Sequence, residues 1–162
     1  MKIRFAEKAD HDLVFEILND EIRRDVNTWH LDAIEGNRRQ AWLDVHSVRE
    51  YPLLVADGGE GIFGWASLSP WAPHGAYLHT AEVSVFIHRS HRNLGVGKSL
   101  LHRLIVEARA VNHHVLISRI EISNEPSRIL HLGSGFRSVG VMHEVGFKFA
   151  RFLDAEIFEL LL

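Results

Sequence analysis

Residues 80–101 read TAEVSVFIHRSHRNLGVGKSLL and join a strand, a glycine loop and the start of a helix. The first part alternates and is rich in β-branched and aromatic residues, which predicts a long strand over 77–87. After the glycines, Leu100, Leu101 and Leu104 follow helical spacing and predict a helix over 95–111. The segment therefore predicts a glycine loop held between a strand and a helix.

The loop Arg92-Asn93-Leu94-Gly95-Val96-Gly97 has the chemistry of a phosphate site. Glycines let the backbone approach a ligand closely, and the unpaired N–H groups and positive dipole end of a new helix favour an anion. A diphosphate-bearing cofactor suits this arrangement. A nucleotide-triphosphate loop is disfavoured because Arg92 stands where that motif needs glycine, and the dinucleotide fingerprint fails at Leu100. A loop whose glycines merely fit the turn is the alternative.

Further strands and helices are expected on both sides of this unit, from the spacing of apolar residues and the positions of turn residues. The expected strands cover 3–5, 53–56, 62–68, 115–122, 136–145 and 149–162, and the expected helices begin after Asp10 and cover 37–48 and 125–132. No repeat or linker interrupts the pattern. We therefore expect one mixed α/β (α+β) domain over residues 1–162, built around a single sheet.

Composition narrows the class of protein. The chain has 162 residues and a formal net charge of -3, which argues against a nucleic-acid partner because such proteins usually carry a basic excess. It has no cysteine, so disulfides, thiolate metal sites and cysteine nucleophiles are excluded. Charged residues near Met1 and the lack of a long apolar run predict neither a signal peptide nor a membrane span. We expect a soluble, cytoplasmic protein.

The pattern Arg-x-x-Gly-x-Gly after a long strand resembles the acetyl-CoA pyrophosphate loop of the GNAT acetyltransferase superfamily. The resemblance implies a twisted, mostly antiparallel mixed sheet of about seven strands flanked by about four helices. It also implies acetyl-CoA as the co-substrate. Loop N–H groups hold the diphosphate in that family, and the next residues open the helix. The cofactor-binding residues carried over are Arg92, Asn93, Leu94, Gly95, Val96, Gly97, Lys98 and Ser99.

Other segments resemble the phosphinothricin or methionine sulfone (sulfoximine) N-acetyltransferase branch of that superfamily. They are residues 37–42, 51–56, 80–87 and 145–149, with Arg151, Leu153 and Asp154. The resemblance implies a homodimer that moves an acetyl group from acetyl-CoA to the amine of a small molecule, such as an amino acid or an amino-acid analogue, by direct attack on the thioester. Acetylation of a protein N-terminus or lysine is an alternative, as is an acyl-CoA-binding module without catalysis.

Two residues are candidates for the proton transfers. Glu82 lies in the middle of a strand that is otherwise apolar or small, and burial in a cleft makes a carboxylate a better proton acceptor. It resembles the base of the branch, although a charge on the solvent face of the strand is the alternative. His131 resembles the branch's general acid for the CoA thiolate, and histidine titrates near neutral pH. A histidine on the surface of the helix is the alternative there.

The same resemblance places further cofactor contacts on the long strand and the short helix. Val85 and Ile87 would pair with the pantetheine arm through their backbone, while their side chains are equally well explained as core. Asn124 and Ser127 would contact pantetheine or phosphate, although such residues more often cap a helix.

Four residues are candidates to wall the acceptor site: Asn19, Trp29, Trp71 and Tyr77. Aromatic side chains are as often part of a core or an interface. The branch often has an arginine after the tryptophan of the loop and another a few residues later, where this chain has Ala72 and Leu78. This difference weakens the case for phosphinothricin or methionine sulfone itself as the acceptor.

The histidines at 88, 91, 102, 113 and 114 raise the question of a metal site. They lack a His-x-x-x-His pair on a helix and an accompanying set of carboxylates. We therefore expect surface histidines and no bound metal.

Overall fold

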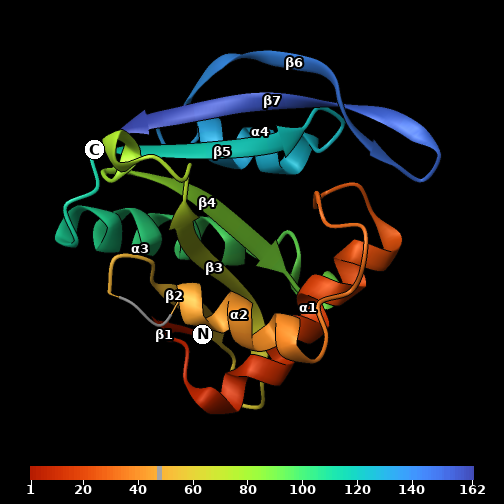
Figure 1. Cartoon of the computed structure of the whole chain (residues 1–162). Helices are drawn as coiled ribbons and strands as arrows, with labels where there is room; N and C mark the ends of the chain where they lie inside the picture. The colour runs from red at the N-terminus through yellow and green to blue at the C-terminus, as the bar shows by residue number, and fades with distance from the viewer. Residues whose placement is uncertain (47–48) are drawn as a thin grey trace.

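A computed structural model describes residues 1–46 and 49–162 (Figure 1). Its seven strands form one sheet. The strands are β1 Lys2–Phe5, β2 Leu53–Asp57, β3 Ile62–Pro70, β4 Thr80–Ile87, β5 Val115–Glu121, β6 Arg137–Lys148 and β7 Arg151–Leu161. They lie side by side in the order β1-β2-β3-β4-β5-β7-β6. Neighbouring strands are antiparallel except for β4 and β5, which are parallel.

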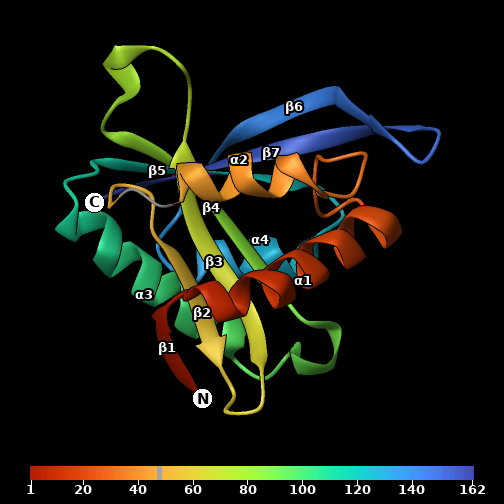
Figure 2. The ribbon, with the colours of Figure 1, turned by 60° about the horizontal axis from the view of Figure 1, so that its bottom comes forward.

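The α-helices of the described residues cover both faces of the sheet (Figure 2). They are α1 His11–Arg24, α2 Asn37–Val45, α3 Val96–Ala110 and α4 Glu125–Leu132. Strand β2 shows how the two faces divide, because side chains alternate along a strand. Leu53 and Val55 pack in the cluster under α1 and α2, while Leu54 and Ala56 pack in the cluster under α3.

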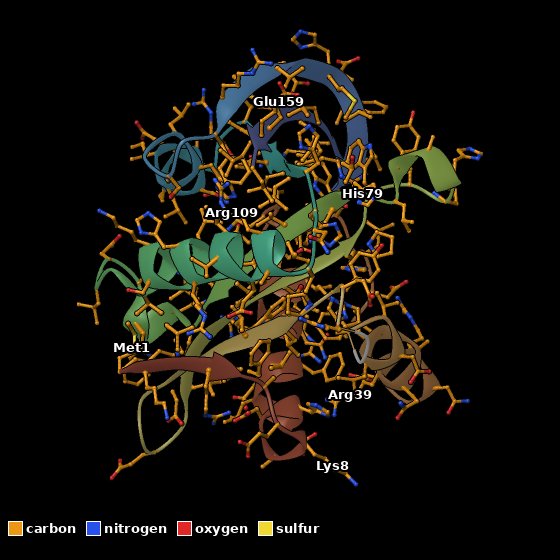
Figure 3. All side chains as sticks on the ribbon, turned by 90° about the vertical axis from the view of Figure 1, so that its left-hand side faces the viewer. Met1, Lys8, Arg39, His79, Arg109 and Glu159 are labelled. Carbon is orange, nitrogen blue, oxygen red and sulfur yellow. The ribbon has the colours of Figure 1, made fainter. Side chains whose placement is uncertain are left out.

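The larger core lies between the sheet and α3, where side chains fill the space (Figure 3). Leu100, Leu101 and Leu104 of α3 are fully buried there. Burying one such side chain stabilises the fold by about 1.5–3 kcal/mol relative to leaving it exposed. The glycine loop that precedes α3 is therefore attached to a rigid element.

The parallel pair β4–β5 stays paired over only a short length. The register joins Thr80, Ala81 and Glu82 to Val115, Leu116 and Ile117, and no pairing follows although both strands continue. From Val83 onward the edge of β4 that faces β5 has no strand beside it in the described pairing. The two strands thus form a V that opens after Glu82.

The predicted fold class is confirmed: the described residues form a mixed, mostly antiparallel sheet of seven strands with four α-helices. The start of the long strand differs from the prediction, because Gly75–Tyr77 form a 3-10 turn (η2) and β4 begins at Thr80. The final hairpin turn lies later than predicted, at Phe149 and Ala150. Both residues have positive φ angles (49° and 58°), which suits a two-residue hairpin turn.

The last turn of the second predicted helix falls partly outside the described residues. Helix α2 is described as far as Val45, and residues 47 and 48, where the predicted helix ends, are not among those that the structure describes. Within the described part of the chain, no helix is long and apolar enough to cross a membrane.

Candidate active site

Glu82 lies at the vertex of the V formed by β4 and β5, where the last paired residues of the two strands stand. Its side chain is 16% exposed, and both of its oxygens accept hydrogen bonds from Arg119 of β5. Arg119 Nε lies 2.6 Å from Oε1, and a terminal guanidinium nitrogen lies 2.7 Å from Oε2. Such a bidentate pair fixes the orientation of the carboxylate.

Arg119 is a residue that the sequence interpretation did not single out. Its guanidinium lies over the ring of Trp71, with Cζ 5.5 Å from the ring centroid. The sequence did offer one signal for a functional role of Arg119: it is a charged residue inside the mostly apolar strand 115–121, as Glu82 is in its own strand. The short parallel register brings the two opposite charges together on one face, and the sequence alone does not reveal that register.

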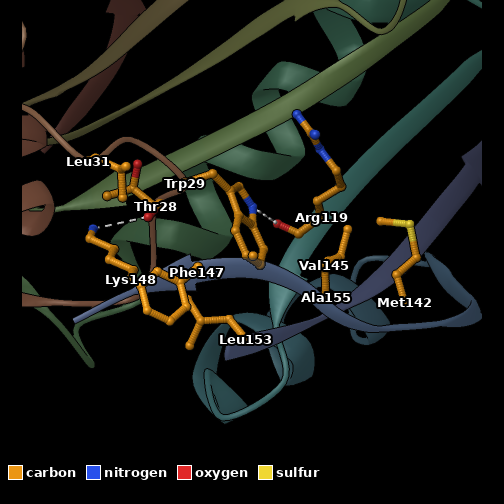
Figure 4. A pocket seen from close by; sticks show the side chains of 11 residues that line it. Thr28, Trp29, Leu31, Arg119, Met142, Val145, Phe147, Lys148, Leu153 and Ala155 are labelled. Atoms are coloured by element: carbon orange, nitrogen blue, oxygen red, sulfur yellow. Dashed lines mark hydrogen bonds between the residues drawn. The ribbon is translucent and has the colours of Figure 1, made fainter. Parts of the chain in front are cut away.

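A pocket of about 220 Å³ lies next to this pair and is shown in Figure 4. Trp29 forms one wall, and its indole N–H donates to the main-chain oxygen of Arg119 at 3.4 Å. Gly146 is required beneath that ring, because a Cβ atom there would lie 2.7 Å from Trp29. The lining residues are Thr28, Trp29, Leu31, Arg119, Met142, Val145, Gly146, Phe147, Lys148, Leu153 and Ala155.

Lys148 holds the loop of Trp29 against the β6–β7 hairpin. Its Nζ donates to the main-chain oxygen of Thr28 at 3.1 Å, and the side chain is buried. Burial lowers the pKa of Lys148, while Asp25 and Glu21 oppose that shift. The loop and the hairpin thus form the pocket together.

The other predicted acceptor-site residues do not line this pocket. Asn19 is buried, and its amide exchanges two hydrogen bonds with the backbone of Ile34, at 2.8 and 3.2 Å. Tyr77 is 45% exposed in the turn before β4. Trp71 reaches the site only through its contact with Arg119. Trp29 is therefore the predicted wall residue that the structure places in the pocket.

The glycine loop leads directly into α3. Asn93 and Gly95 have positive φ angles of 62° and 78°, so the backbone turns sharply twice before the helix begins at Val96. The first N–H groups of a helix have no partner within it and point away from its start. Gly97 has a packing reason as well, since a Cβ atom there would lie 3.2 Å from the side chain of Leu130. That the N–H groups of this loop and of the start of α3 hold a diphosphate stays a prediction.

The side chain of Arg92 points away from the loop and into the protein. It pairs with Glu21 of α1, whose carboxylate is 4% exposed. Glu21 also forms an ion pair with Arg89 at 3.3 Å and accepts a hydrogen bond from the side-chain amide of Asn27 at 3.1 Å. One buried carboxylate therefore connects α1, the glycine loop and the segment that carries Trp29. The sequence interpretation missed Glu21.

The predicted pantetheine strand lies along the open V. Val85 and Ile87 are half-buried on β4, beyond the last residue that pairs with β5. Asn124 caps α4, with its side-chain oxygen accepting from the Ser127 N–H at 3.2 Å. Capping is the alternative that the sequence left open for Asn124. Lys98 and Ser99 lie in the first turn of α3, and Ser99 Oγ donates to the Gly95 carbonyl at 3.2 Å.

His131 of α4 is buried, so it is not a histidine on the helix surface. Its Nδ1 lies 2.8 Å from the main-chain oxygen of Ser127. Since a carbonyl oxygen only accepts, Nδ1 carries the proton of the neutral ring, and Nε2 presents a lone pair. Nε2 is buried without a hydrogen-bond partner among the described residues. Burial lowers the pKa of His131, while the bond to Ser127 opposes that shift.

The lowered pKa of His131 predicts a pH-dependent stability. As the pH falls below about 6.5, His131 takes up a proton in the unfolded chain but stays neutral when buried in the folded protein. The free energy of unfolding therefore decreases with falling pH. In His131→Gln we expect a smaller loss of the free energy of unfolding between pH 7.5 and 5.5 than in the wild type. His46→Gln should behave similarly, because burial also lowers the pKa of His46. Denaturant titrations at several pH values measure this, and an unchanged loss in His131→Gln contradicts it.

No group of three or more His, Cys, Asp or Glu side chains within residues 1–46 and 49–162 is arranged to hold a metal ion.

A family model described as the acetyltransferase (GNAT) family matches residues 12–136. The L-methionine sulfoximine/L-methionine sulfone acetyltransferase of Salmonella typhimurium is 36% identical over 160 residues, covering 99% of this chain and 94% of the relative. This similarity confirms the predicted branch.

Two solved structures share the fold over the whole of this chain. Ribosomal-protein-alanine N-acetyltransferase from Brucella melitensis has a TM-score of 0.96 at 34% identity, with all of both chains covered. The yncA acetyltransferase of Salmonella typhimurium, solved with its cofactor acetyl-CoA, has a TM-score of 0.94 at 37% identity, covering 100% of this chain and 94% of that one. The second structure combines this fold with acetyl-CoA, the co-substrate that the resemblance implies.

Proposed function

Because the chain belongs to the GNAT acetyltransferase family and is an acetyl-CoA-dependent N-acetyltransferase, we propose an acceptor for it. This acceptor is the amine of an amino acid or of a close analogue. One observation supports this most directly. A carboxylate, Glu82, lies at the vertex of the open strands and beside a pocket of about 220 Å³. That volume suits a small acceptor rather than a folded protein surface.

The proposed cofactor contacts follow the V and the glycine loop. Backbone N–H groups from Arg92 to Gly97 hold the diphosphate, and Lys98 and Ser99 open the helix behind them. The free edge of β4 at Val85 and Ile87 pairs with the pantetheine arm. Acetyl-CoA supplies an acetyl group activated as a thioester. The acceptor must therefore enter from the side of Trp29 and meet the cofactor near Glu82.

Glu82 is the proposed base. An amine is an ammonium ion at neutral pH and becomes a nucleophile only after losing a proton, which the carboxylate can accept directly or through a water. The nitrogen then forms a bond to the acetyl carbon as the carbon–sulfur bond breaks. Holding both reactants in one cleft supplies much of the rate enhancement, since the attack becomes effectively unimolecular.

His131 is the proposed partner of the departing thiolate. Its neutral ring keeps the proton on Nδ1, at the Ser127 carbonyl, so it acts as an acid only after Nε2 has received a proton. The ammonium loses two protons on the way to the amide. One of them restores the thiol of CoA through His131, and the other passes from Glu82 to solvent. Asn124 and Ser127 position this histidine through the cap of α4.

Acetylation of a protein N-terminus is the second candidate. The observation in its favour is the likeness to the Brucella melitensis structure, whose name states a protein substrate. The apolar walls around the pocket and its small volume favour the small-molecule acceptor.

We further propose a cytoplasmic homodimer, with residues 1–162 acting as one domain. Apolar side chains are exposed along the β6–β7 hairpin, at Val145, Phe147, Phe149 and Phe152, each more than half exposed. This hairpin projects beyond the rest of the sheet (Figure 2). A second copy would cover it, and sedimentation analysis that gives a monomer mass at micromolar concentration would refute the dimer.

Release of CoA from acetyl-CoA tests the acceptor class in a thiol-detection assay. The panel comprises the common L-amino acids, methionine sulfone, methionine sulfoximine, phosphinothricin, polyamines and short peptides. Turnover with at least one amino acid or analogue, and less with polyamines and peptides, is expected. Turnover confined to peptides would establish the protein-acceptor alternative. Acetyl-CoA binding without any turnover would refute the proposed acceptor.

A further inference from the structure

Arg119 lines the acceptor pocket and touches Glu82, yet the mechanism above gives it no task. We infer that Arg119 binds the carboxylate of an amino-acid acceptor and thereby releases Glu82 to receive the acceptor's ammonium group. This inference rests on the proposed function and narrows the acceptor to molecules with an amine and a carboxylate close together. Arg119 is then a determinant of specificity.

The ion pair with Arg119 engages the carboxylate of Glu82, the proposed base. Both oxygens of Glu82 accept hydrogen bonds from Arg119, at 2.6 and 2.7 Å. An ammonium group that approaches Glu82 therefore competes with a bidentate partner, which is among the stronger side-chain interactions. Catalysis requires that this pair loosen when the acceptor binds.

The charge of the acceptor decides how easily the pair between Glu82 and Arg119 loosens. A simple amine brings a second positive charge to a carboxylate that is already paired, and the two cations repel at short distance. A zwitterionic amino acid brings one charge of each sign. Its ammonium can take the place of Arg119 at Glu82 while its carboxylate takes the place of Glu82 at Arg119. Every charge remains paired throughout the exchange.

The guanidinium is suited to this exchange. It carries five N–H donors in a planar fork that matches a carboxylate, and the pair with Glu82 uses two of them. The Arg119 side chain is 40% exposed, whereas that of Glu82 is 16% exposed, so the cation is the more accessible member of the pair. An entering carboxylate can meet Arg119 before Glu82 is released.

Two tryptophans hold Arg119 in place. Trp29 donates its indole N–H to the main-chain oxygen of Arg119 at 3.4 Å, a contact drawn in Figure 4. Trp71 lies under the guanidinium at 5.5 Å. In Figure 4 the Arg119 side chain extends away from the apolar wall of the pocket. The acceptor's charged end and its side chain thus have separate places in one site.

Matched acceptors and matched variants test the inference. The acceptors are an L-amino acid that the wild type acetylates and the amide of the same amino acid, which keeps the amine and lacks the carboxylate charge. In Arg119→Met we expect kcat/KM for the amino acid to fall by roughly 10- to 100-fold, mainly through a higher KM. The value for the amide should stay the same or rise, because its ammonium no longer competes with a cation at Glu82.

Two further variants guard against misfolding and general effects. Arg119→Lys keeps the charge but not the fork, so it should retain more activity on the amino acid than Arg119→Met. Arg137→Met removes an arginine that pairs with Glu159 outside the pocket and should leave both acceptors unaffected. Acetyl-CoA affinity and the thermal midpoint of each variant report on folding.

The outcomes separate the inference from the proposed function. If the wild type acetylates the amino acid but Arg119→Met slows both acceptors equally, Arg119 only orients Glu82 and the inference is wrong. An unchanged amino acid-to-amide ratio in Arg119→Met likewise overturns it. If the wild type acetylates no amino acid at all, the proposed function fails instead.

Discussion

Glu82→Gln is expected to lower kcat by about 10²- to 10⁴-fold, the range that one general base contributes. Glutamine keeps the size of the side chain and an oxygen that can accept from Arg119, so the strand vertex should stay intact. It cannot take a proton from the acceptor ammonium. Acetyl-CoA affinity should change by less than about twofold, because the diphosphate and pantetheine contacts lie elsewhere. Steady-state kinetics with the best acceptor, together with acetyl-CoA titration, measure both quantities.

A pH profile makes the test specific for base catalysis. The residual activity of Glu82→Gln should rise with pH as the free amine becomes more abundant, since the variant depends on acceptor that is already deprotonated. Glu159→Gln, which alters a glutamate on β7 that pairs with Arg137, serves as the control and should retain wild-type kinetics. If Glu82→Gln keeps more than about a tenth of wild-type kcat, another group is the base.

Glu21→Ala is expected to destabilise the fold and weaken acetyl-CoA binding together. The carboxylate is buried, forms ion pairs with Arg92 and Arg89, and accepts a hydrogen bond from Asn27. Breaking a fully buried pair costs about 3–5 kcal/mol, but the two arginines are partly exposed, so a loss of about 2–3 kcal/mol is expected. Without its anchor Arg92 no longer fixes the start of the glycine loop, and the Kd of acetyl-CoA should rise about tenfold.

The exposed pair Glu35–Arg23 offers a matched control. Both side chains are more than half exposed, so Glu35→Ala should change the free energy of unfolding by less than about 0.5 kcal/mol and leave acetyl-CoA binding unchanged. Denaturant unfolding and calorimetric titration of acetyl-CoA give the two readouts. If Glu21→Ala loses stability but binds acetyl-CoA normally, the carboxylate is structural and does not support the loop.

The order and type of the elements were largely predictable because local patterns carry that information. Residues 125–132 were predicted as a helix and form α4 with those bounds. Ends of strands were less predictable, since they depend on neighbours. Strand β6 continues past a bulge between Met142 and Gly146, where its pairing with β7 shifts register. A bulge of this kind has no strong local signal.

The candidate site was predictable where its chemistry lies in a continuous segment. The loop 92–99 and the strand 80–87 were identified together, because a glycine loop before a helix has a local physical meaning. Glu21 left a weaker signal. It stands at helical spacing from Ile17 and Leu18, on the apolar side of α1, where a charged residue needs a partner. Its arginine partners lie about 70 residues later, so only folding reveals them.

The sequence by itself determined the family, the order of the elements, the glycine loop and the carboxylate at residue 82, because each depends on residues close together in the chain. Tertiary structure decided which charges meet. Arg119 reaches Glu82 across the parallel strands, and Trp29, from the segment after α1, reaches the main chain of Arg119 on β5. Long-range pairing depends on strand register and packing, and a single sequence does not record either. The proposed acceptor site therefore depends on long-range contacts, whereas the proposed cofactor loop is recognisable within one continuous segment.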